Sequence, residues 1–256
     1  MAGTTQRGRF FVEHLPAPPV GGELPRVELG TAEGHHAMHV LRLGVGDEVE
    51  LFDGQGGRCV GQILTAKHSH VTVEVRERLE MLRRPSPRVE LAFAVPKGNR
   101  LDWLLEKATE LGAAALVPVR FARSVAGGEE LSDSKRERWL GHCVAAAKQC
   151  RLDFLPELRP LVPATELAKT IAAGQGSLLA VMGDLGENVP PLREVLLGAR
   201  PETTVLLLVG PEGDFTSEEV ALFRAAGVRS ARLGSTTLRV ETAAVALLAA
   251  TVGLLG

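Results

Sequence analysis

Residues 205–215 read Val-Leu-Leu-Leu-Val-Gly-Pro-Glu-Gly-Asp-Phe. The five apolar residues at the start of this run predict a strand that is buried on both faces. The two glycines of the turn that follows allow the backbone to approach a ligand closely. Thr216 and Glu219 then have the spacing of a capping box, which predicts that the next helix begins there. A buried strand, a turn and a helix together indicate one unit of a parallel sheet covered by helices.

The same alternation of strand and helix extends over the chain after residue 85. After a buried-strand run at 89–95, apolar residues recur at helical spacing and end at Gly112. This stripe consists of Leu101, Leu104, Leu105, Ala108 and Leu111. The alternation continues through 116–121, 135–149, 178–182, 191–197, 205–209, 217–226 and 230–233, and a final apolar helix starts at about residue 241. This order predicts an α/β fold with a mostly parallel sheet.

The first part of the chain has the two-residue period of strands instead. Strand-like segments at 9–12, 48–52, 58–64 and 70–75 predict a small antiparallel meander or barrel. The polar, proline-containing segment 78–87 is the best candidate for a linker. We therefore predict one domain at 1–84 and a second at 85–256. Residues 1–8 have no periodic pattern, and we expect them to be disordered.

The composition limits the classes of protein to which the chain can belong. Of 256 residues, 45% are hydrophobic, and 29 Lys and Arg stand against 31 Asp and Glu. These values exclude a disordered or collagen-like chain, and three cysteines are too few for a disulfide scaffold. The longest apolar stretch, 243–255, is shorter than a bilayer span, and no signal peptide opens the chain. We expect a soluble, cytoplasmic protein with no membrane partner.

Ligands of open parallel sheets bind beyond the carboxyl ends of the strands, so the candidate loops follow Met182, Val209 and Leu233. For any one such loop, a strand-to-helix connection that binds no ligand is about as common as a ligand site. The dinucleotide and P-loop fingerprints and the nucleophile elbow are absent from the sequence. We expect no metal site, because no ligand set completes His35, His36 and His39. The cysteines are interpreted as buried thiols rather than nucleophiles.

Two motifs in order carry a family resemblance. GPEGDF at 210–215, followed about twenty residues later by LGSTTLRVETA at 233–243, closely resembles the 16S ribosomal RNA uridine N3-methyltransferases, the ribosomal small subunit methyltransferase E family of the SPOUT class. Other matching segments lie at 9–11, 39–42, 51–54, 97–98, 106–112 and 149–156. Family members usually have Gly in place of Asp214 and a basic residue in place of Thr236. They also usually have Glu in place of Lys148.

The resemblance implies a PUA-like N-terminal β-barrel that helps to hold RNA. It also implies a C-terminal SPOUT domain with a deep trefoil knot that binds S-adenosylmethionine, and a homodimer formed through that domain. The implied activity is methylation of N3 of a specific uridine in 16S ribosomal RNA, on the assembled small subunit. The alternatives are a catalytically weakened SPOUT-like RNA-binding or ribosome-assembly factor, which the departure at Thr236 keeps open, and an unrelated nucleotide-binding α/β enzyme.

The resemblance also assigns roles to residues of this sequence. Arg239 is the only basic residue within the two motifs, and we expect it to stabilise negative charge on the uracil or to contact phosphate; an ion pair with Glu212 or Glu241 is the structural alternative. The expected cofactor residues are Met182, Gly183, Val209, Gly210, Pro211, Glu212, Gly213, Leu233, Gly234 and Leu238. The expected RNA contacts are Arg9, His39, Arg42, Lys97, Arg100 and Arg151.

Overall fold

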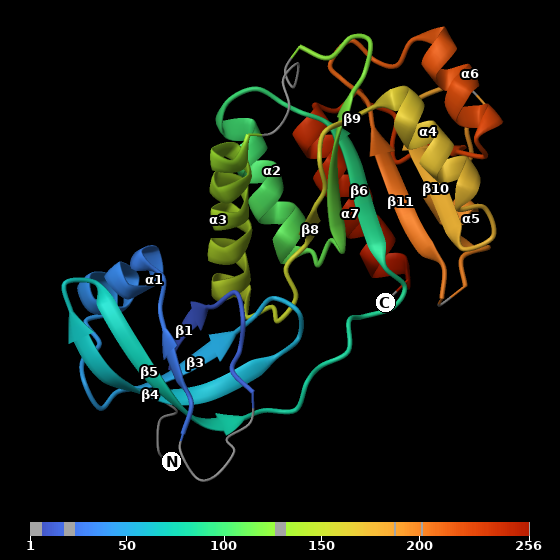
Figure 1. The fold of residues 1–256 in the computed structure, drawn as a ribbon. Helices are drawn as coiled ribbons and strands as arrows, with labels where there is room; N and C mark the ends of the chain where they lie inside the picture. Colours follow the sequence, from blue (N-terminus) through green and yellow to red (C-terminus); the bar gives the residue numbers. More distant parts are fainter. Residues whose placement is uncertain (1–6, 18–23, 126–131, 187, 201, 256) are drawn as a thin grey trace. The chain divides into compact units, whose positions relative to one another are not determined.

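The computed structural model describes residues 7–17, 24–125, 132–186, 188–200 and 202–255. The chain divides into two compact units, which Figure 1 shows along the sequence from blue to red. The first unit contains Met1–Arg84 and Ala147–Leu155, and the second contains Pro85–Ala146 and Pro156–Gly256. The sequence predicts a single boundary at residue 84. It does not predict that residues 147–155 belong to the first unit.

The first unit is built on a five-stranded sheet. Its strands, in spatial order, are β1 (Gly8–Phe11), β3 (Glu48–Phe52), β4 (Arg58–Lys67), β5 (His70–Arg78) and β2 (Arg26–Glu28). β1 runs parallel to β3, whereas the other pairs are antiparallel as expected. Among the described residues no pairing joins the two edge strands, so the element is an open sheet in its hydrogen bonding.

Short helical segments and a tight turn complete the first unit. α1 (Thr31–His35) continues directly into a π-helix, η1 (His36–Val40), which the sequence analysis did not predict. β4 and β5 are joined by a tight hairpin turn with positive φ at His68 and Ser69. The expected disorder of residues 1–8 is wrong for Gly8, where β1 begins, because its backbone pairs with Val49; residues 1–6 lie outside the described part of the chain.

The second unit is built on a seven-stranded sheet in which every strand pair is parallel. The order is β12 (Arg229–Ala231), β10 (Leu178–Gly183), β11 (Thr204–Val209), β6 (Val89–Ala94), β7 (Ala115–Arg120) and β8 (Glu157–Leu158), with β9 (Val162–Pro163) also paired to β7. The four central strands are buried almost throughout. The sequence prediction of a mostly parallel sheet is confirmed.

Helices cover both faces of this sheet, as Figure 1 shows for α4 and α6 on one face and α7 on the other. The described helices after residue 85 are α2 (Asn99–Glu110), α3 (Asp133–Cys150), α4 (Ala164–Ala173), α5 (Leu192–Leu196), α6 (Ser217–Ala225) and α7 (Val240–Leu255). α2 packs on α7, which also contacts β6 and β11. The predicted capping box at Thr216 and Glu219 is present at the start of α6. None of the described helices is long and apolar enough to cross a membrane.

Candidate functional site

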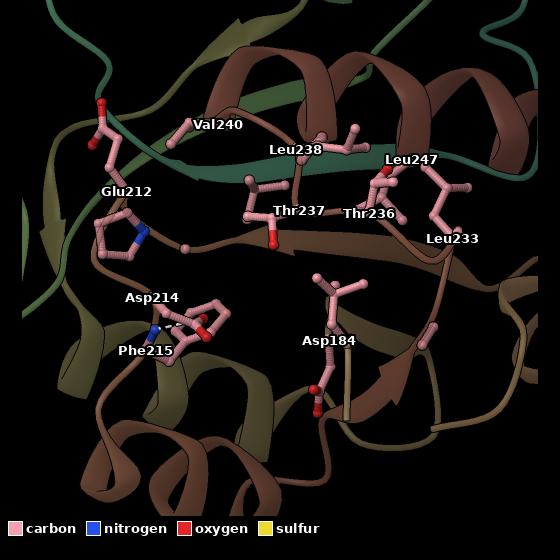
Figure 2. Close-up of a pocket in the computed structure, with 18 residues that line it drawn as sticks. Asp184, Glu212, Asp214, Phe215, Leu233, Thr236, Thr237, Leu238, Val240 and Leu247 are labelled. Atoms are coloured by element: carbon pink, nitrogen blue, oxygen red, sulfur yellow. Dashed lines mark hydrogen bonds between the residues drawn. The ribbon is translucent and has the colours of Figure 1, made fainter. Parts of the chain in front are cut away.

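A pocket lies at the carboxyl ends of β10 and β11, where the three candidate loops of the second unit converge (Figure 2). It is lined by Gly183, Asp184, Leu185, Val209, Gly210, Pro211, Glu212, Asp214, Phe215, Ala231, Leu233, Gly234, Thr236, Thr237, Leu238, Val240, Ala243 and Leu247. Both sequence motifs therefore meet in one cavity, as expected for ligand sites of parallel sheets. Figure 2 shows Thr236, Thr237 and Leu238 on the side of α7, opposite Asp184 and Asp214.

Eight of the ten residues expected to hold a cofactor line this pocket, and two do not. Met182 is only 1% exposed within β10, so its side chain belongs to the core. The side of Gly213 where a Cβ atom would stand faces Arg123, at 3.2 Å from its side chain. Gly213 thus turns its Cβ side away from the pocket, whereas a Cβ atom on Gly210 would stand 2.9 Å from the ring of Phe215, another residue of the pocket.

Ten lining residues were not among the expected cofactor contacts: Asp214, Phe215, Thr236 and Thr237 lie within the two motifs, Ala231 ends β12, and the other five form two groups. Asp184 and Leu185 simply continue the chain beyond β10. Val240, Ala243 and Leu247 come from α7, where their helical spacing places them on one face; that spacing was a usable signal.

Asp214 occupies a position where the backbone favours glycine. Its φ is +62°, in the left-handed region that Asp tolerates better than most residues. The Asp214 carboxylate accepts a hydrogen bond from the backbone amide of Phe215 at 2.8 Å. The aspartate at this position therefore adds a carboxylate to the pocket wall without changing the turn that glycine would form.

The pocket wall is acidic. Asp184, Glu212 and Asp214 line it, and none of the residues that line it is Lys, Arg or His. Two of these carboxylates have cations nearby from outside the pocket, since Asp184 lies 3.7 Å from Arg224 and Glu212 lies 3.5 Å from Arg100. The site is therefore suited to a ligand that carries positive charge.

Arg100 joins the two sequence motifs. It lies in the first turn of α2, and its guanidinium also reaches Glu241, at 3.9 Å. Glu241 is buried at the start of α7. The acidic residues proposed as structural partners of Arg239 thus pair with Arg100 instead. The sequence predicts that Arg100 contacts RNA, whereas in this structure its guanidinium pairs with the carboxylates of Glu212 and Glu241.

Arg239 lies at the rim of the pocket, between the lining residues Leu238 and Val240. Its side chain is exposed, and it forms no ion pair with any residue that the structure describes. The guanidinium is therefore exposed to solvent, and Arg239 itself is not among the residues that line the pocket.

The remaining expected RNA contacts, apart from Arg9, are exposed. Lys97 lies in the second unit, immediately before α2, whereas His39, Arg42 and Arg151 belong to the first unit. The ring of His39 lies 4.6 Å from that of His35. Arg151 pairs with Glu50 at 3.9 Å. Exposure leaves each of these four side chains accessible to RNA.

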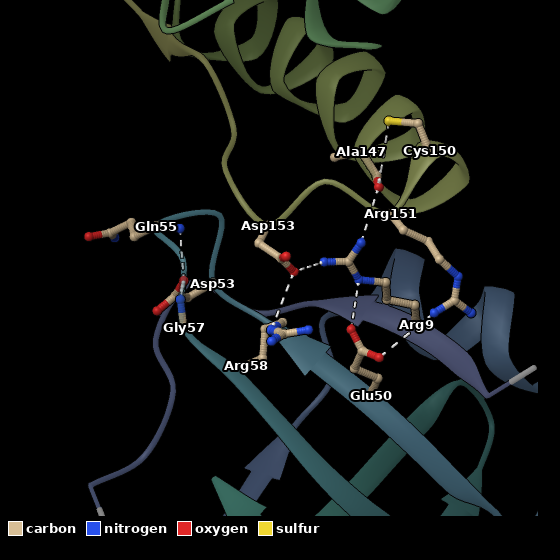
Figure 3. A network of polar contacts seen from close by, with 10 residues as sticks. All are labelled: Arg9, Glu50, Asp53, Gln55, Gly57, Arg58, Ala147, Cys150, Arg151 and Asp153. Carbon is tan, nitrogen blue, oxygen red and sulfur yellow. Dashed lines mark hydrogen bonds and ion pairs between the residues drawn. The ribbon is translucent and has the colours of Figure 1, made fainter. Parts of the chain in front are cut away.

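Arg9 is buried in a network of charges within the first unit (Figure 3). It forms ion pairs with Glu50, at 3.2 Å, and with Asp153, and its guanidinium lies 4.2 Å from the ring centroid of Phe52. Burial lowers the pKa of Arg9, while Asp153 and then Glu50 oppose this effect. The expectation that Arg9 contacts phosphate is wrong, because its side chain is 4% exposed and its charge is already paired.

We expect Arg9→Met to lower the free energy of unfolding by roughly 2 kcal/mol, because it leaves two largely buried carboxylates without their main partner. Arg58 and Arg151 remain within 3.9 Å of these carboxylates and limit the loss. Urea denaturation measures the change, and Arg42→Met is the exposed control. Unchanged stability together with weaker RNA binding would restore the phosphate role of Arg9.

The histidines and cysteines form no further site. No group of three or more His, Cys, Asp or Glu side chains within the described ranges is arranged to hold a metal ion. Cys59 and Cys143 are buried, and burial raises the pKa of Cys143 to about 11. That thiol therefore stays protonated at neutral pH, in agreement with the interpretation of a buried, unreactive cysteine.

Comparison with known families gives two matches that follow one another along the chain. Residues 29–76 match the RNA methyltransferase PUA domain, and residues 83–252 match the RNA methyltransferase domain. The second match contains every residue that lines the pocket.

Individual proteins resemble the chain over most of its length. The ribosomal RNA small subunit methyltransferase E of Synechocystis sp. is 32% identical, covering 87% of this chain and 71% of the relative. The protein of that name from Bacillus subtilis is 28% identical and covers 94% of both chains. A protein from Legionella pneumophila, solved with S-adenosylmethionine bound as cofactor, is 26% identical, with a TM-score of 0.80 over 96% of this chain and 97% of that one.

Proposed function

The chain belongs to the ribosomal RNA small subunit methyltransferase E family, and we propose that it transfers a methyl group from S-adenosylmethionine to N3 of a uridine in 16S ribosomal RNA. The observation that carries this proposal is the meeting of both family motifs in one pocket at the carboxyl ends of β10 and β11. A chain that had kept only the RNA-binding role would not need to maintain a small-molecule pocket there.

The pocket fits the chemistry of S-adenosylmethionine. This cofactor carries a positively charged sulfur and an ammonium group, and Asp214, which forms no ion pair with a residue that the structure describes, provides negative charge in the wall. Leu233, Leu238 and Leu247 provide apolar surface for a base such as adenine. The glycines in the wall leave backbone amide and carbonyl groups accessible for hydrogen bonds.

The chain's own residues have two tasks in this reaction. When bound, S-adenosylmethionine supplies an electrophilic methyl group. N3 of uridine must lose its proton to accept that group, so negative charge develops on the uracil. Arg239 stands at the pocket rim and stabilises that charge through O2 or O4. The pocket wall holds the cofactor in a fixed orientation relative to the target nitrogen.

A catalytically weakened RNA-binding or assembly factor is the second candidate. The feature that favours it is Thr236, which lines the pocket where family members usually carry a basic residue. Calorimetric titration with S-adenosylmethionine, followed by methyl incorporation into small ribosomal subunits and mapping of the modified atom, distinguishes the two. Tight cofactor binding with N3-methyluridine as the product supports the enzyme. Subunit binding without methyl incorporation supports the second candidate.

We extend the proposal to the domains and the fold. The domain at 1–84 is proposed to hold RNA through exposed side chains such as His39 and Arg42, and the domain at 85–256 to carry out methyl transfer. The trefoil knot is proposed because the chain returns from the edge strand β12 to the carboxyl ends of β11 and β6, where α7 packs. The proposed substrate places the protein in the cytoplasm, with the ribosomal subunits.

A homodimer is proposed to form through α7. Thr242, Ala249 and Gly253 are exposed at roughly helical spacing on this helix, and Leu254 beside them is 53% exposed. Such a surface of small residues allows a second helix to approach closely. Sedimentation equilibrium tests the proposal, which requires twice the mass of one chain.

A further inference from the structure

The loop at 210–216, after β11, forms a large part of the pocket wall but makes few bonds of its own. Its lining residues are Gly210, Pro211, Glu212, Asp214 and Phe215. The backbone hydrogen bond within its turn runs from the Asp214 amide to the Pro211 carbonyl, at 2.9 Å. Apart from the ion pair between Arg100 and Glu212, the main contacts of this loop come from residues 121–123, which follow β7, and from Glu219 and Phe223 in α6.

Glu219 connects the two loops through the two oxygens of one carboxylate. The Thr216 amide donates to Oε2 at 2.9 Å, which is the usual bond of a capping box. The Ala122 amide donates to Oε1 at 2.7 Å. The residue is only 7% exposed, so both bonds lie out of water, where hydrogen bonds to a charged acceptor are strong.

Two further contacts join the same segments. Arg123 donates from Nη1 to the Gly213 carbonyl at 2.7 Å. The ring of Phe121 meets that of Phe215 edge to face, with centroids 5.3 Å apart, and both rings pack on Phe223. Phe121 and Phe223 are buried, so Phe215 is held against a rigid surface on the side away from the pocket.

The segment that makes these contacts is itself fixed. Ser124 donates its amide to the Phe121 carbonyl at 3.1 Å, and its Oγ accepts from the Phe121 amide at 2.9 Å. β7 and β11 are not neighbours in the sheet, because β6 lies between them. The contacts therefore cross over the end of β6 and join loops that sheet hydrogen bonding alone would leave independent.

We propose that residues 121–124 form a brace that holds the loop 210–216 in its cofactor-binding conformation, with Glu219 as the positioning residue and Arg123 as a second tether. The inference rests on the proposed function, since the loop is assigned to the cofactor there. Phe121, Ala122, Arg123 and Glu219 do not line the pocket, so they act on affinity through the loop. Ligand binding costs less free energy when the loop is already ordered than when the ligand must order the loop.

Calorimetric titration of the full-length protein with S-adenosylmethionine tests the brace. Glu219→Gln replaces one acceptor oxygen by an NH2 group that cannot accept from an amide, and we expect about tenfold weaker binding. Arg123→Ala is expected to weaken binding about fivefold, and Arg123→Lys, which keeps a donor, less than that. The control is Glu202→Gln, at an exposed glutamate paired with Arg200, and it should bind as the wild type does.

Hydrogen exchange of the loop amides without ligand provides the second readout, at a temperature where every variant is folded. The brace requires faster exchange over 210–216 in Glu219→Gln and Arg123→Ala than in the control. A lower Tm with unchanged affinity and unchanged exchange would mean that Glu219 only caps α6, and would overturn the proposal. If the wild type does not bind S-adenosylmethionine, the proposed function fails, and the exchange comparison still decides on the brace.

Discussion

Replacing Arg239 with alanine is expected to lower the single-turnover rate of methyl transfer about 100-fold, the loss typical of removing one preorganised group that faces developing charge. The affinity for S-adenosylmethionine should stay within about twofold of the wild-type value, because an interaction formed only as the uracil loses its proton does not contribute to ground-state binding. Arg239 is exposed at the pocket rim between two lining residues, whereas Glu212 and Glu241 pair with Arg100. Its charge is therefore free to act on a substrate.

Rates at saturating RNA and cofactor separate this role from phosphate binding. A phosphate contact would leave the saturated rate nearly intact and would reduce the salt dependence of RNA binding. Arg239→Lys keeps the charge and should recover part of the rate, and Arg193→Ala, at an exposed arginine of α5, serves as the control. A rate near wild type for Arg239→Ala would reject the catalytic assignment.

Local periodicity was sufficient to predict the alternation of strands and helices in the second unit, although α4 and the short strands β8 and β9 were not predicted. A strand buried on both faces is apolar at nearly every position, as in β11, and this signal does not depend on distant residues. The same holds for α2, where Leu104, Leu105 and Ala108 are buried as their spacing predicts. Once strands and helices alternate, the position of a ligand site at the carboxyl ends follows from topology.

The features that were missed depend on contacts between residues far apart in the sequence. The burial of Arg9 is one example. Its main partner, Asp153, is far from it in the sequence, and no local sequence pattern connects the two residues. The same segment carries Leu155, whose amide donates to the Gly54 carbonyl at 2.8 Å. A basic residue near the N-terminus therefore looked like a surface charge although it is part of a buried network.

The candidate site shows the same limit. The loop after β11 and the capping box of Thr216 and Glu219 were predicted from local residues, but no local pattern indicated that Glu219 also binds the Ala122 amide or that Arg123 binds the Gly213 carbonyl. Nor did a local pattern indicate that Arg100, in the first turn of α2, neutralises a carboxylate of the pocket. The side of a glycine on which a Cβ atom would stand is likewise set by the surrounding fold. In this loop, Gly210 rather than Gly213 is therefore the glycine whose substitution is expected to weaken cofactor binding most.

Gly210→Val is expected to weaken the binding of S-adenosylmethionine by about 100-fold, which corresponds to roughly 3 kcal/mol of overpacking. Gly210 lines the pocket, and even a Cβ atom there would lie 2.9 Å from the ring of Phe215. That ring cannot move aside easily, because Phe121 and Phe223 pack against it. The added side chain must therefore displace the loop or enter the space that the ligand needs.

Gly213→Val is the matched control, because it adds the same side chain three residues further along the same loop. Its Cβ atom would stand 3.2 Å from the side chain of Arg123 and would disturb the Arg123 tether without facing the pocket, so we expect a loss of affinity of about fivefold, as for Arg123→Ala. Calorimetry on both folded variants measures the difference, with thermal unfolding as the check on folding. If Gly213→Val weakened binding as much as Gly210→Val, the loop would have to turn its other side to the cofactor. Equal, wild-type affinity for both variants would remove the loop after β11 from the cofactor site.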